Sequence, residues 1–188
     1  MSFFSKRVGI KIPKHIKVLY NQKKNHLMFI GPLGVKIIML KFKLFLSIKG
    51  NYIFIASYLG KISKKYIRSF CGTFQSQLKQ TLLDLSVKFH KTLKLFGVGF
   101  KAYSLKIGYT HVLQFKLGFS HFIFYKIPQD VGLTSLKETK LYLTNPCLKK
   151  VTQISAIIRS FKFPDIYKGK GILYSNEKIV LKKGKKIT

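Results

Sequence analysis

The stretch from Ser63 to Leu85, SKKYIRSFCGTFQSQLKQTLLDL, decides the fold class of this chain. Its apolar residues recur at steps of three and four, which places them on one face of an α-helix. Ser63 is a favoured N-cap, because its hydroxyl can accept a backbone N–H bond that the first turn leaves open. Gly72 weakens the helix only a little. The stretch therefore predicts one long amphipathic helix, with apolar positions Ile67, Phe70, Cys71, Phe74, Leu78, Leu82 and Leu85.

The residues before this helix have the pattern of short strands. They are rich in Ile, Leu, Phe and Tyr and are interrupted by turn signals. Gly31 to Gly34 forms one such turn, and Gly50-Asn51 predicts a tight hairpin, since glycine supplies the positive φ that the turn needs. We expect strands at residues 16–20, 26–30, 35–40, 44–48 and 52–56.

The residues after the helix repeat this order of strands followed by a helix. Asn145-Pro146 predicts a helix cap with proline in the first turn, where a missing N–H costs nothing. Val151, Ile154 and Ile158 then fall on one side, and Pro164 ends the helix. The strands are expected at residues 93–107, broken or bulged near Gly97 and Gly99, and at 111–117, 122–127 and 140–143.

The repeated order predicts an α+β fold of two similar small domains, each an antiparallel or mixed sheet packed against a helix. We place the first domain at residues 1–88 and the second at 89–164. Residues 165–188 are expected to be a basic C-terminal tail, because their apolar residues are too sparse for a core element. Such a tail repels itself in water and gains order along phosphates.

The charge of the chain points to a polyanionic partner. Lys and Arg number 36 against 5 Asp and Glu, a formal net charge of +31. Nucleic acid supplies anions in bulk, and each neutralised phosphate releases a counterion; an anionic membrane surface is the main competitor. Disorder is excluded by 47% hydrophobic residues with 17 Phe and 10 Tyr. No apolar stretch approaches the ~20 residues of a membrane-spanning helix, so we expect no membrane insertion.

The sequence shows no catalytic or metal-binding arrangement. Two-carboxylate catalysis needs both groups in one site, whereas the carboxylates here are scattered, and we expect them to satisfy turns and local Lys pairs. Cys71 and Cys147 lack CxxC spacing, and the histidines lack metal-ligand spacing. We therefore predict no enzyme, no metal and no cofactor; the carboxylates are Asp84, Asp130, Glu138, Asp165 and Glu177.

The run Tyr167-Lys168-Gly169-Lys170-Gly171 has the composition of an RNA-backbone clamp. Glycine lets the backbone approach a phosphate closely, lysine adds charge, and tyrosine can stack or donate a hydrogen bond. The same composition also occurs in flexible tails, so the run alone does not decide the function.

Three stretches in the right order resemble the large-subunit ribosomal protein "L-six" family. Residues 163–172, FPDIYKGKGI, resemble its P-E-P-Y-K-G-K-G-I signature, with Asp165 for Glu and Ile166 for the second Pro. Residues 95–102, LFGVGFKA, resemble its L-x-G-V-G-Y-[RK]-A, and residues 117–121 match its L-G-F-S-H. The resemblance is specific from about Thr92 to Lys186 and rests on order and pattern before that.

This resemblance implies two α+β modules on large-subunit rRNA, beside the sarcin-ricin loop and the stalk base, where translational GTPases dock and other large-subunit proteins are neighbours. Glycines would allow close approach, lysines would neutralise phosphates, and Ser120, His121 and Tyr167 would hydrogen-bond or stack. The alternative for Gly97, Gly99 and Ser120 is that they only shape a bulge and a turn. The implied rRNA-binding residues are Gly97, Gly99, Lys101, Ser120, His121, Tyr167, Lys168, Gly169, Lys170 and Gly171, together with the tail lysines Lys182, Lys183, Lys185 and Lys186.

The residue usage suggests an organelle. Basic residues are nearly all Lys, Ala is scarce and Trp is absent, which we interpret as the imprint of an AT-rich genome. Residues 9–14 already align with the start of the first domain, so we expect no cleavable transit peptide. A mitochondrial ribosome is the first expectation and a plastid-type organelle the second. The alternative function is a non-ribosomal nucleic-acid-binding protein, such as an RNA chaperone or a DNA-compacting protein.

Overall fold

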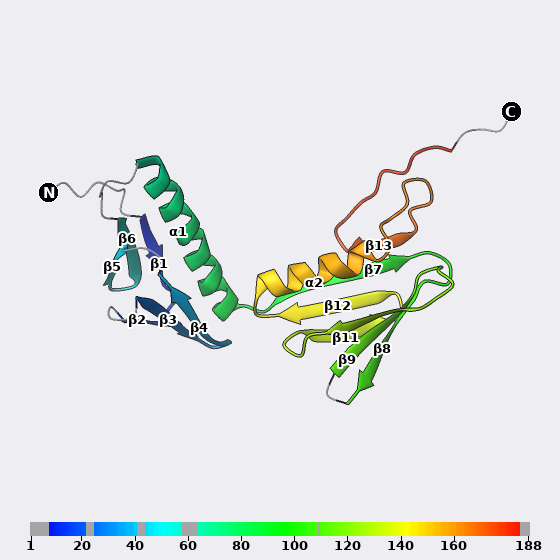
Figure 1. Ribbon diagram of the computed structural model, residues 1–188, viewed down its shortest axis with the longest axis horizontal. Helices are drawn as coiled ribbons and strands as arrows, with labels where there is room; N and C mark the ends of the chain where they lie inside the picture. Colours follow the sequence, from blue (N-terminus) through cyan, green and yellow to red (C-terminus); the bar gives the residue numbers. More distant parts are fainter. Residues whose placement is uncertain (1–7, 22–24, 41–43, 58–63, 109, 185–188) are drawn as a thin grey trace. The chain divides into compact units, whose positions relative to one another are not determined.

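The computed structural model describes residues 8–21, 25–40, 44–57, 64–108 and 110–184 (Figure 1). The chain divides into two compact units, Met1–Lys88 and Phe89–Thr188. Each unit combines antiparallel sheets with one helix, which confirms the predicted α+β class. Within these ranges, neither helix has the length and apolar character needed to cross a membrane. The predicted helix cap at Ser63 lies outside the described residues.

In the described part of the first unit there are two three-stranded sheets and one helix. Strands β1 (Val8–Lys11), β6 (Tyr52–Ser57) and β5 (Leu44–Lys49) form one sheet in the order β1-β6-β5. Strands β2 (Lys17–Asn21), β3 (His26–Gly31) and β4 (Gly34–Met39) form the other in chain order. Helix α1 (Lys64–Ser86) packs on β3, β4 and β6. Its predicted apolar face is confirmed where it is described, since Phe74, Leu78, Leu82 and Leu85 are buried with Leu27, Phe29 and Ile53.

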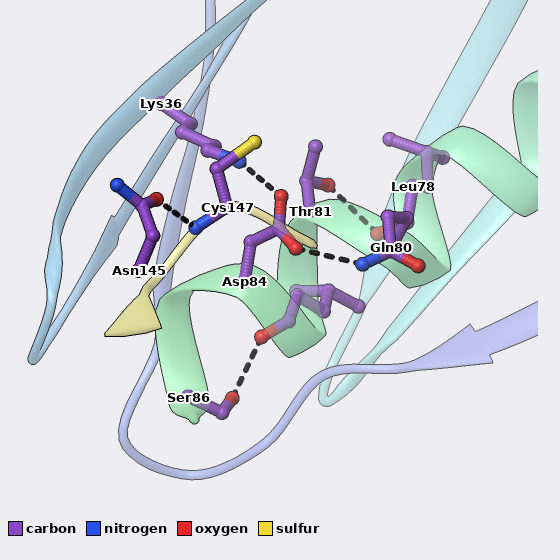
Figure 2. Close-up of polar contacts among 9 residues, drawn as sticks. Lys36, Leu78, Gln80, Thr81, Asp84, Ser86, Asn145 and Cys147 are labelled. Atoms are coloured by element: carbon purple, nitrogen blue, oxygen red, sulfur yellow. Dashed lines mark hydrogen bonds and ion pairs between the residues drawn. The ribbon is translucent and has the colours of Figure 1, made fainter. Parts of the chain in front are cut away.

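One buried carboxylate connects α1 to the sheet in the first unit. The Asp84 side chain, 3% exposed, accepts an ion-paired hydrogen bond from Lys36 of β4 (Figure 2). Gln80, one turn earlier on the helix, donates to the other Asp84 oxygen at 2.7 Å. A buried charge is tolerated only when it is paired and hydrogen-bonded, so this triad fixes the helix against β4.

The second unit has a four-stranded and a three-stranded sheet. Helix α2 (Leu148–Ser160) packs on strands β7 (Phe89–Phe96), β12 (Lys140–Asn145) and β13 (Gly171–Tyr174). These three strands and β11 (Gly132–Lys137) are ordered β11-β12-β7-β13. The second sheet contains β8 (Lys101–Ile107), β9 (Thr110–Lys116) and β10 (Ile123–Ile127) in chain order. Buried residues from both sheets and α2 form one core, among them Leu93, Phe100, Phe115, Leu143, Ile158 and Ile172.

Two predictions about the second unit are wrong. The segment after Pro164 does contain a core element, because Gly171–Tyr174 pairs with β7 and buries Ile172 and Leu173. The helix cap is Cys147, with Leu148 as the first helical residue, so Asn145-Pro146 precedes the helix. Asn145 Oδ1 instead accepts a hydrogen bond from the Cys147 backbone N at 2.6 Å (Figure 2). This contact fixes the turn that leads into the helix.

Candidate nucleic-acid interface

The buried ring of Phe100 holds two glycine-containing loops together. A Cβ on Gly97 would meet this ring at 3.0 Å, and a Cβ on Gly118 would meet it at 3.1 Å. Both glycines also have positive φ, 144° and 72°, a conformation that other residues adopt with strain. The loop after β7 and the loop after β9 therefore both pack against one aromatic residue, and glycine is favoured at both positions.

The loop after β9 is also linked to the segment that follows α2. The rings of Phe119 and His121 are stacked with centroids 5.7 Å apart, and Lys162 Nζ lies 4.3 Å from the Phe119 ring centroid. An ammonium over an aromatic face is attracted by the ring quadrupole. Ser120 and His121 are both exposed, so the loop presents a hydroxyl and an imidazole to solvent.

Asp165 organises the lysine-rich turn. Its carboxylate accepts hydrogen bonds from the backbone N–H groups of Tyr167 at 3.3 Å and Lys168 at 3.2 Å. Its carbonyl accepts from Gly169 N at 2.9 Å, and its own N–H donates to the Lys170 carbonyl at 3.0 Å. The turn thus closes on itself and leaves Tyr167, 59% exposed, and both lysine side chains outside.

Gly171 connects this turn to the Gly97 loop. It is buried and pairs with Phe96, the residue directly before Gly97. A Cβ here would lie 2.5 Å from Pro164 Cα and 2.7 Å from the Phe163 carbonyl oxygen. Gly171 therefore lies beneath the turn, where only glycine fits.

Three motifs that are far apart in sequence are consequently neighbours at one end of the second unit. We call residues 97–99, 118–121 and 165–170 the three-loop surface. Phe100 joins its first two loops, Lys162 joins the second to the post-helix segment, and the Gly171–Phe96 pairing joins the third to the first. Figure 1 shows the segment after α2 rising beside the end of β7.

An Arg–Glu pair braces the segment behind this surface. Arg159 of α2 donates to both Glu177 oxygens, from Nη2 at 2.5 Å and from Nε at 3.2 Å. Its guanidinium also lies 5.4 Å from the ring centroids of Phe163 and Tyr174. These hydrogen bonds hold the pKa of Glu177 below its ordinary value of 4.5, with a smaller contribution from the Tyr174 backbone N–H.

All the carboxylates of the chain are engaged within the protein. Asp84 pairs with Lys36, Asp130 with Lys150, Glu138 with Lys101 and Glu177 with Arg159, while Asp165 organises its turn. The prediction that carboxylates satisfy turns holds for Asp165. The prediction of local lysine pairs is wrong, because each of the four paired carboxylates has a partner distant in sequence, and the partner of Glu177 is an arginine. Five anions cannot balance 36 cations, so most of the positive charge has no acidic partner within the chain. The described residues contain no cluster of three or more His, Cys, Asp or Glu side chains that could hold a metal ion.

Known proteins resemble this chain over nearly its whole length. It is 36% identical over 187 residues to large ribosomal subunit protein uL6 of Mycoplasmoides gallisepticum, covering 98% of this chain and 97% of that protein. It is 32% identical over 156 residues to uL6 of Laribacter hongkongensis, covering 83% and 84% of the two chains. The chain belongs to the uL6 family. No protein-family model matches it. Because the similarity to the Mycoplasmoides protein spans both units, the first unit belongs to the same family pattern as the second.

Most of the residues that the uL6 motifs predicted for RNA binding lie on or beside the three-loop surface. Lys101 directly follows it and pairs with Glu138 at 2.8 Å. This hydrogen bond to Glu138, followed by the Coulombic attraction, raises the pKa of Lys101. The pair is solvent-exposed and therefore weak enough to exchange for a phosphate. Lys182 and Lys183 are exposed beyond β13, and Lys185 and Lys186 lie outside the described residues.

Sequence reasoning missed the residues that assemble this uL6 surface. In the sequence Phe100 was noted only as part of a motif, whereas in the structure Gly97 and Gly118 both pack against its ring. Lys162 and Arg159 act through aromatic rings that are near in space but mostly not in sequence. The spacing of the two motifs does not indicate that Gly97 and Gly118 pack on the same ring.

Proposed function

We propose that this chain is a structural protein of the large ribosomal subunit that binds large-subunit rRNA through the three-loop surface and catalyses nothing. Membership of the uL6 family supports the ribosomal role. The observation that carries the RNA-binding part is the meeting of three glycine-, lysine- and histidine-containing loops at one end of the second unit. Loops on a rigid scaffold are where binding groups usually lie.

The chemistry of the surface suits folded RNA. Lys168 and Lys170 stand out from a turn whose backbone is already hydrogen-bonded, so they are free to neutralise phosphates. Gly169, at φ 69°, lets the backbone approach a phosphate closely. Tyr167 and His121 offer exposed rings on which an unstacked base can lie. The tail lysines extend the same charge along the RNA.

The finer position in the ribosome is also a proposal. We infer that the surface lies beside the sarcin-ricin loop and the stalk base and so supports the region where translational GTPases dock. Chemical probing of the rRNA in large subunits with and without this chain tests it. Protection of these two rRNA regions is the expected result, and protection confined to other helices would contradict the position but leave the ribosomal role intact.

We propose the ribosome of an organelle as the location, a mitochondrion first and a plastid-type organelle second. The support is the lysine-rich, alanine-poor residue usage, since arginine binds phosphate at least as well as lysine and chemistry alone does not favour the bias. The two relatives described above are bacterial proteins. Mapping the gene to an organellar or other genome in its source organism tests the proposal, and a bacterial chromosome would overturn it.

Salt-dependent binding to a large-subunit rRNA transcript tests the RNA-binding proposal directly. The variant Lys168→Ala/Lys170→Ala is compared with Lys79→Ala/Lys149→Ala, a matched control that removes two exposed lysines from α1 and α2. We expect the first variant to lose affinity and to reduce the slope of log K against log salt by about two, since each phosphate contact contributes about one. The control should keep the wild-type slope.

The alternative function, a non-ribosomal RNA chaperone or DNA-compacting protein, makes a different prediction. In that case binding depends on total charge, so both double variants weaken it equally and duplex DNA competes as well as rRNA does. Equal loss in the two variants would therefore overturn the three-loop surface as the binding site.

A further inference from the structure

The outward face of the sheet β8-β9-β10 carries aromatic and basic side chains in rows. The strand register places Tyr103, Gln114 and Phe124 side by side across the three strands. Lys116 belongs to the row nearer the three-loop surface, and Lys126 to the row on the other side. Because side chains alternate between faces, all five point away from the core that contains Leu113 and Phe115.

This face is open within its own unit. Phe124 is 61% exposed and Phe122 is 46% exposed. None of the described residues stacks a ring on either of them, and neither Tyr103 nor Phe124 packs against the core of the unit. Exposed aromatic rings next to one another on an uncovered sheet face indicate a binding surface.

The free charges on the face are positive. Lys116 and Lys126 are exposed, and no described carboxylate pairs with either, since all the acidic side chains are engaged elsewhere. The face therefore combines aromatic rings, an amide that can both donate and accept hydrogen bonds, and two unbalanced ammonium groups.

The face is continuous with the three-loop surface. Strand β8 begins directly after the Gly97–Gly99 loop, and β9 and β10 border the Gly118–His121 loop. An RNA bound to the loops would pass over the first rows of the sheet. This continuity, together with the charge, favours nucleic acid over a protein partner, because lysine is depleted at the centres of protein–protein interfaces.

We infer that this face binds unpaired nucleotides, with bases stacked on Tyr103 and Phe124, a base edge at Gln114 and phosphates at Lys116 and Lys126. Aromatic side chains on a sheet are a common platform for splayed-out RNA bases. The inference rests on the proposed rRNA-binding function and extends it from backbone contacts at the loops to base contacts on the sheet.

The test compares two RNAs in equilibrium binding with the full chain: a hairpin with an internal loop of unpaired nucleotides, and the same hairpin fully paired. Phe124→Leu and Tyr103→Leu should each lower affinity for the looped hairpin on the order of fivefold or more. The salt slope should stay at the wild-type value, because no phosphate contact is lost. Phe124→Tyr should retain binding, since it keeps the ring.

Ile37→Ala is the matched control, because Ile37 lies on the third strand of the corresponding sheet in the first unit and is 56% exposed. It should bind both hairpins as the wild type does. Circular dichroism and the thermal midpoint verify that every variant is folded, and Tyr103→Leu still tests the inference if Phe124→Leu does not fold.

Wild-type affinity in Phe124→Leu and Tyr103→Leu, with loss only in Lys168→Ala/Lys170→Ala, would overturn this inference and leave the proposed function standing. No salt-dependent binding by the wild-type chain to either hairpin or to the rRNA transcript would instead overturn the proposed function. If the ring variants bind RNA normally but leave the ribosomal particle at lower salt than the wild type, the face contacts a protein and the inference is wrong.

Discussion

The two units present different surface chemistry on the same kind of sheet. In β2-β3-β4 the outward rows contain Leu19, Met28 and Ile37, then Ile30 and Val35, with Met39 at the edge. Lys17 is the only charged side chain on that face among the described residues. In β8-β9-β10 the matching rows contain Tyr103, Gln114 and Phe124, then Lys101 and Lys116 on one side, and Leu105, Val112 and Lys126 on the other.

The two sheets have the same architecture but different surface residues, so the architecture alone does not determine what a sheet can bind. Both sheets have three antiparallel strands in chain order, each in a unit with a single helix. Function depends on the residues that such a scaffold carries. The aromatic and basic face suits nucleotides, whereas the aliphatic face offers little to a polyanion.

The largest expected effect comes from Gly171, which lies beneath the lysine-rich turn of the second unit. Gly171→Val introduces a Cβ 2.5 Å from Pro164 Cα at a φ of 155°, and should destabilise the second unit by about 3 kcal/mol or more. Urea unfolding followed by circular dichroism in about 0.5 M salt, where charge repulsion is screened, measures it.

The matched change in the first unit should act in the opposite direction. Gly72 is an exposed position in α1 where an added Cβ meets nothing within 4 Å. Gly72→Ala should therefore stabilise the protein by about 0.5–1 kcal/mol, because alanine favours the helix. Equal effects of the two changes would contradict the packing role of Gly171.

The next largest effect is the loss of stability when an ion pair is removed, which should be greater for the buried pair of the first unit than for an exposed pair of the second. Asp84→Ala leaves Lys36 and Gln80 without their acceptor and should cost about 2–3 kcal/mol. Asp130→Ala removes the exposed Lys150 pair and should cost about 0.5 kcal/mol or less. Thermal unfolding measures both, and similar losses would show that burial does not set the value of these pairs.

A smaller effect concerns the pH dependence of the second unit. The pKa of Glu177 is lowered by Arg159, so the carboxylate contributes stability above its ordinary value of 4.5 and loses it as pH falls through the folded-state pKa. Glu177→Gln should cost about 1 kcal/mol at pH 7 and nothing at a pH below both values. A cost that is constant across acid titration would mean that the pair is not ionic.

The smallest expected effect is that of a lysine placed on the outward face of β2-β3-β4, and it tests whether this face differs in RNA binding from that of β8-β9-β10. Ile37→Lys places a charge on the aliphatic face and should change stability by about 0.5 kcal/mol or less, since the residue is exposed. It should leave the salt slope of rRNA binding unchanged. An increase of about one in that slope would place this face on the RNA as well.

The elements that were predictable from sequence are those with strong local periodicity. Phe74, Leu78 and Leu82 defined the α1 face, and the turns at Gly31–Gly34 and Gly50-Asn51 separated strands near the predicted positions. Strand β13 was not predicted because its only strongly apolar residues, Ile172 and Leu173, are too short a signal. They directly follow the polar run from Lys168 to Gly171, which predicts a tail.

The individual residues of the candidate site were predictable from the sequence, but the fact that they form one surface was not. The glycines and lysines were found from motifs, whereas their meeting around Phe100 and Lys162 depends on tertiary contacts. The position of the helix cap was missed for a local reason: the Asn145 side chain accepts from the Cys147 backbone N–H two residues later, and the helix begins after that turn.

Sedimentation of ribosomal particles through a high-salt wash tests the central claim most directly. The chain is followed in a lysate of its source organism, beside the Lys168→Ala/Lys170→Ala variant and the Lys79→Ala/Lys149→Ala control. The account predicts that the wild type and the control stay with the large subunit while the three-loop variant is released. Release of all three at modest salt, with spread over free nucleic acid or membranes, would contradict it.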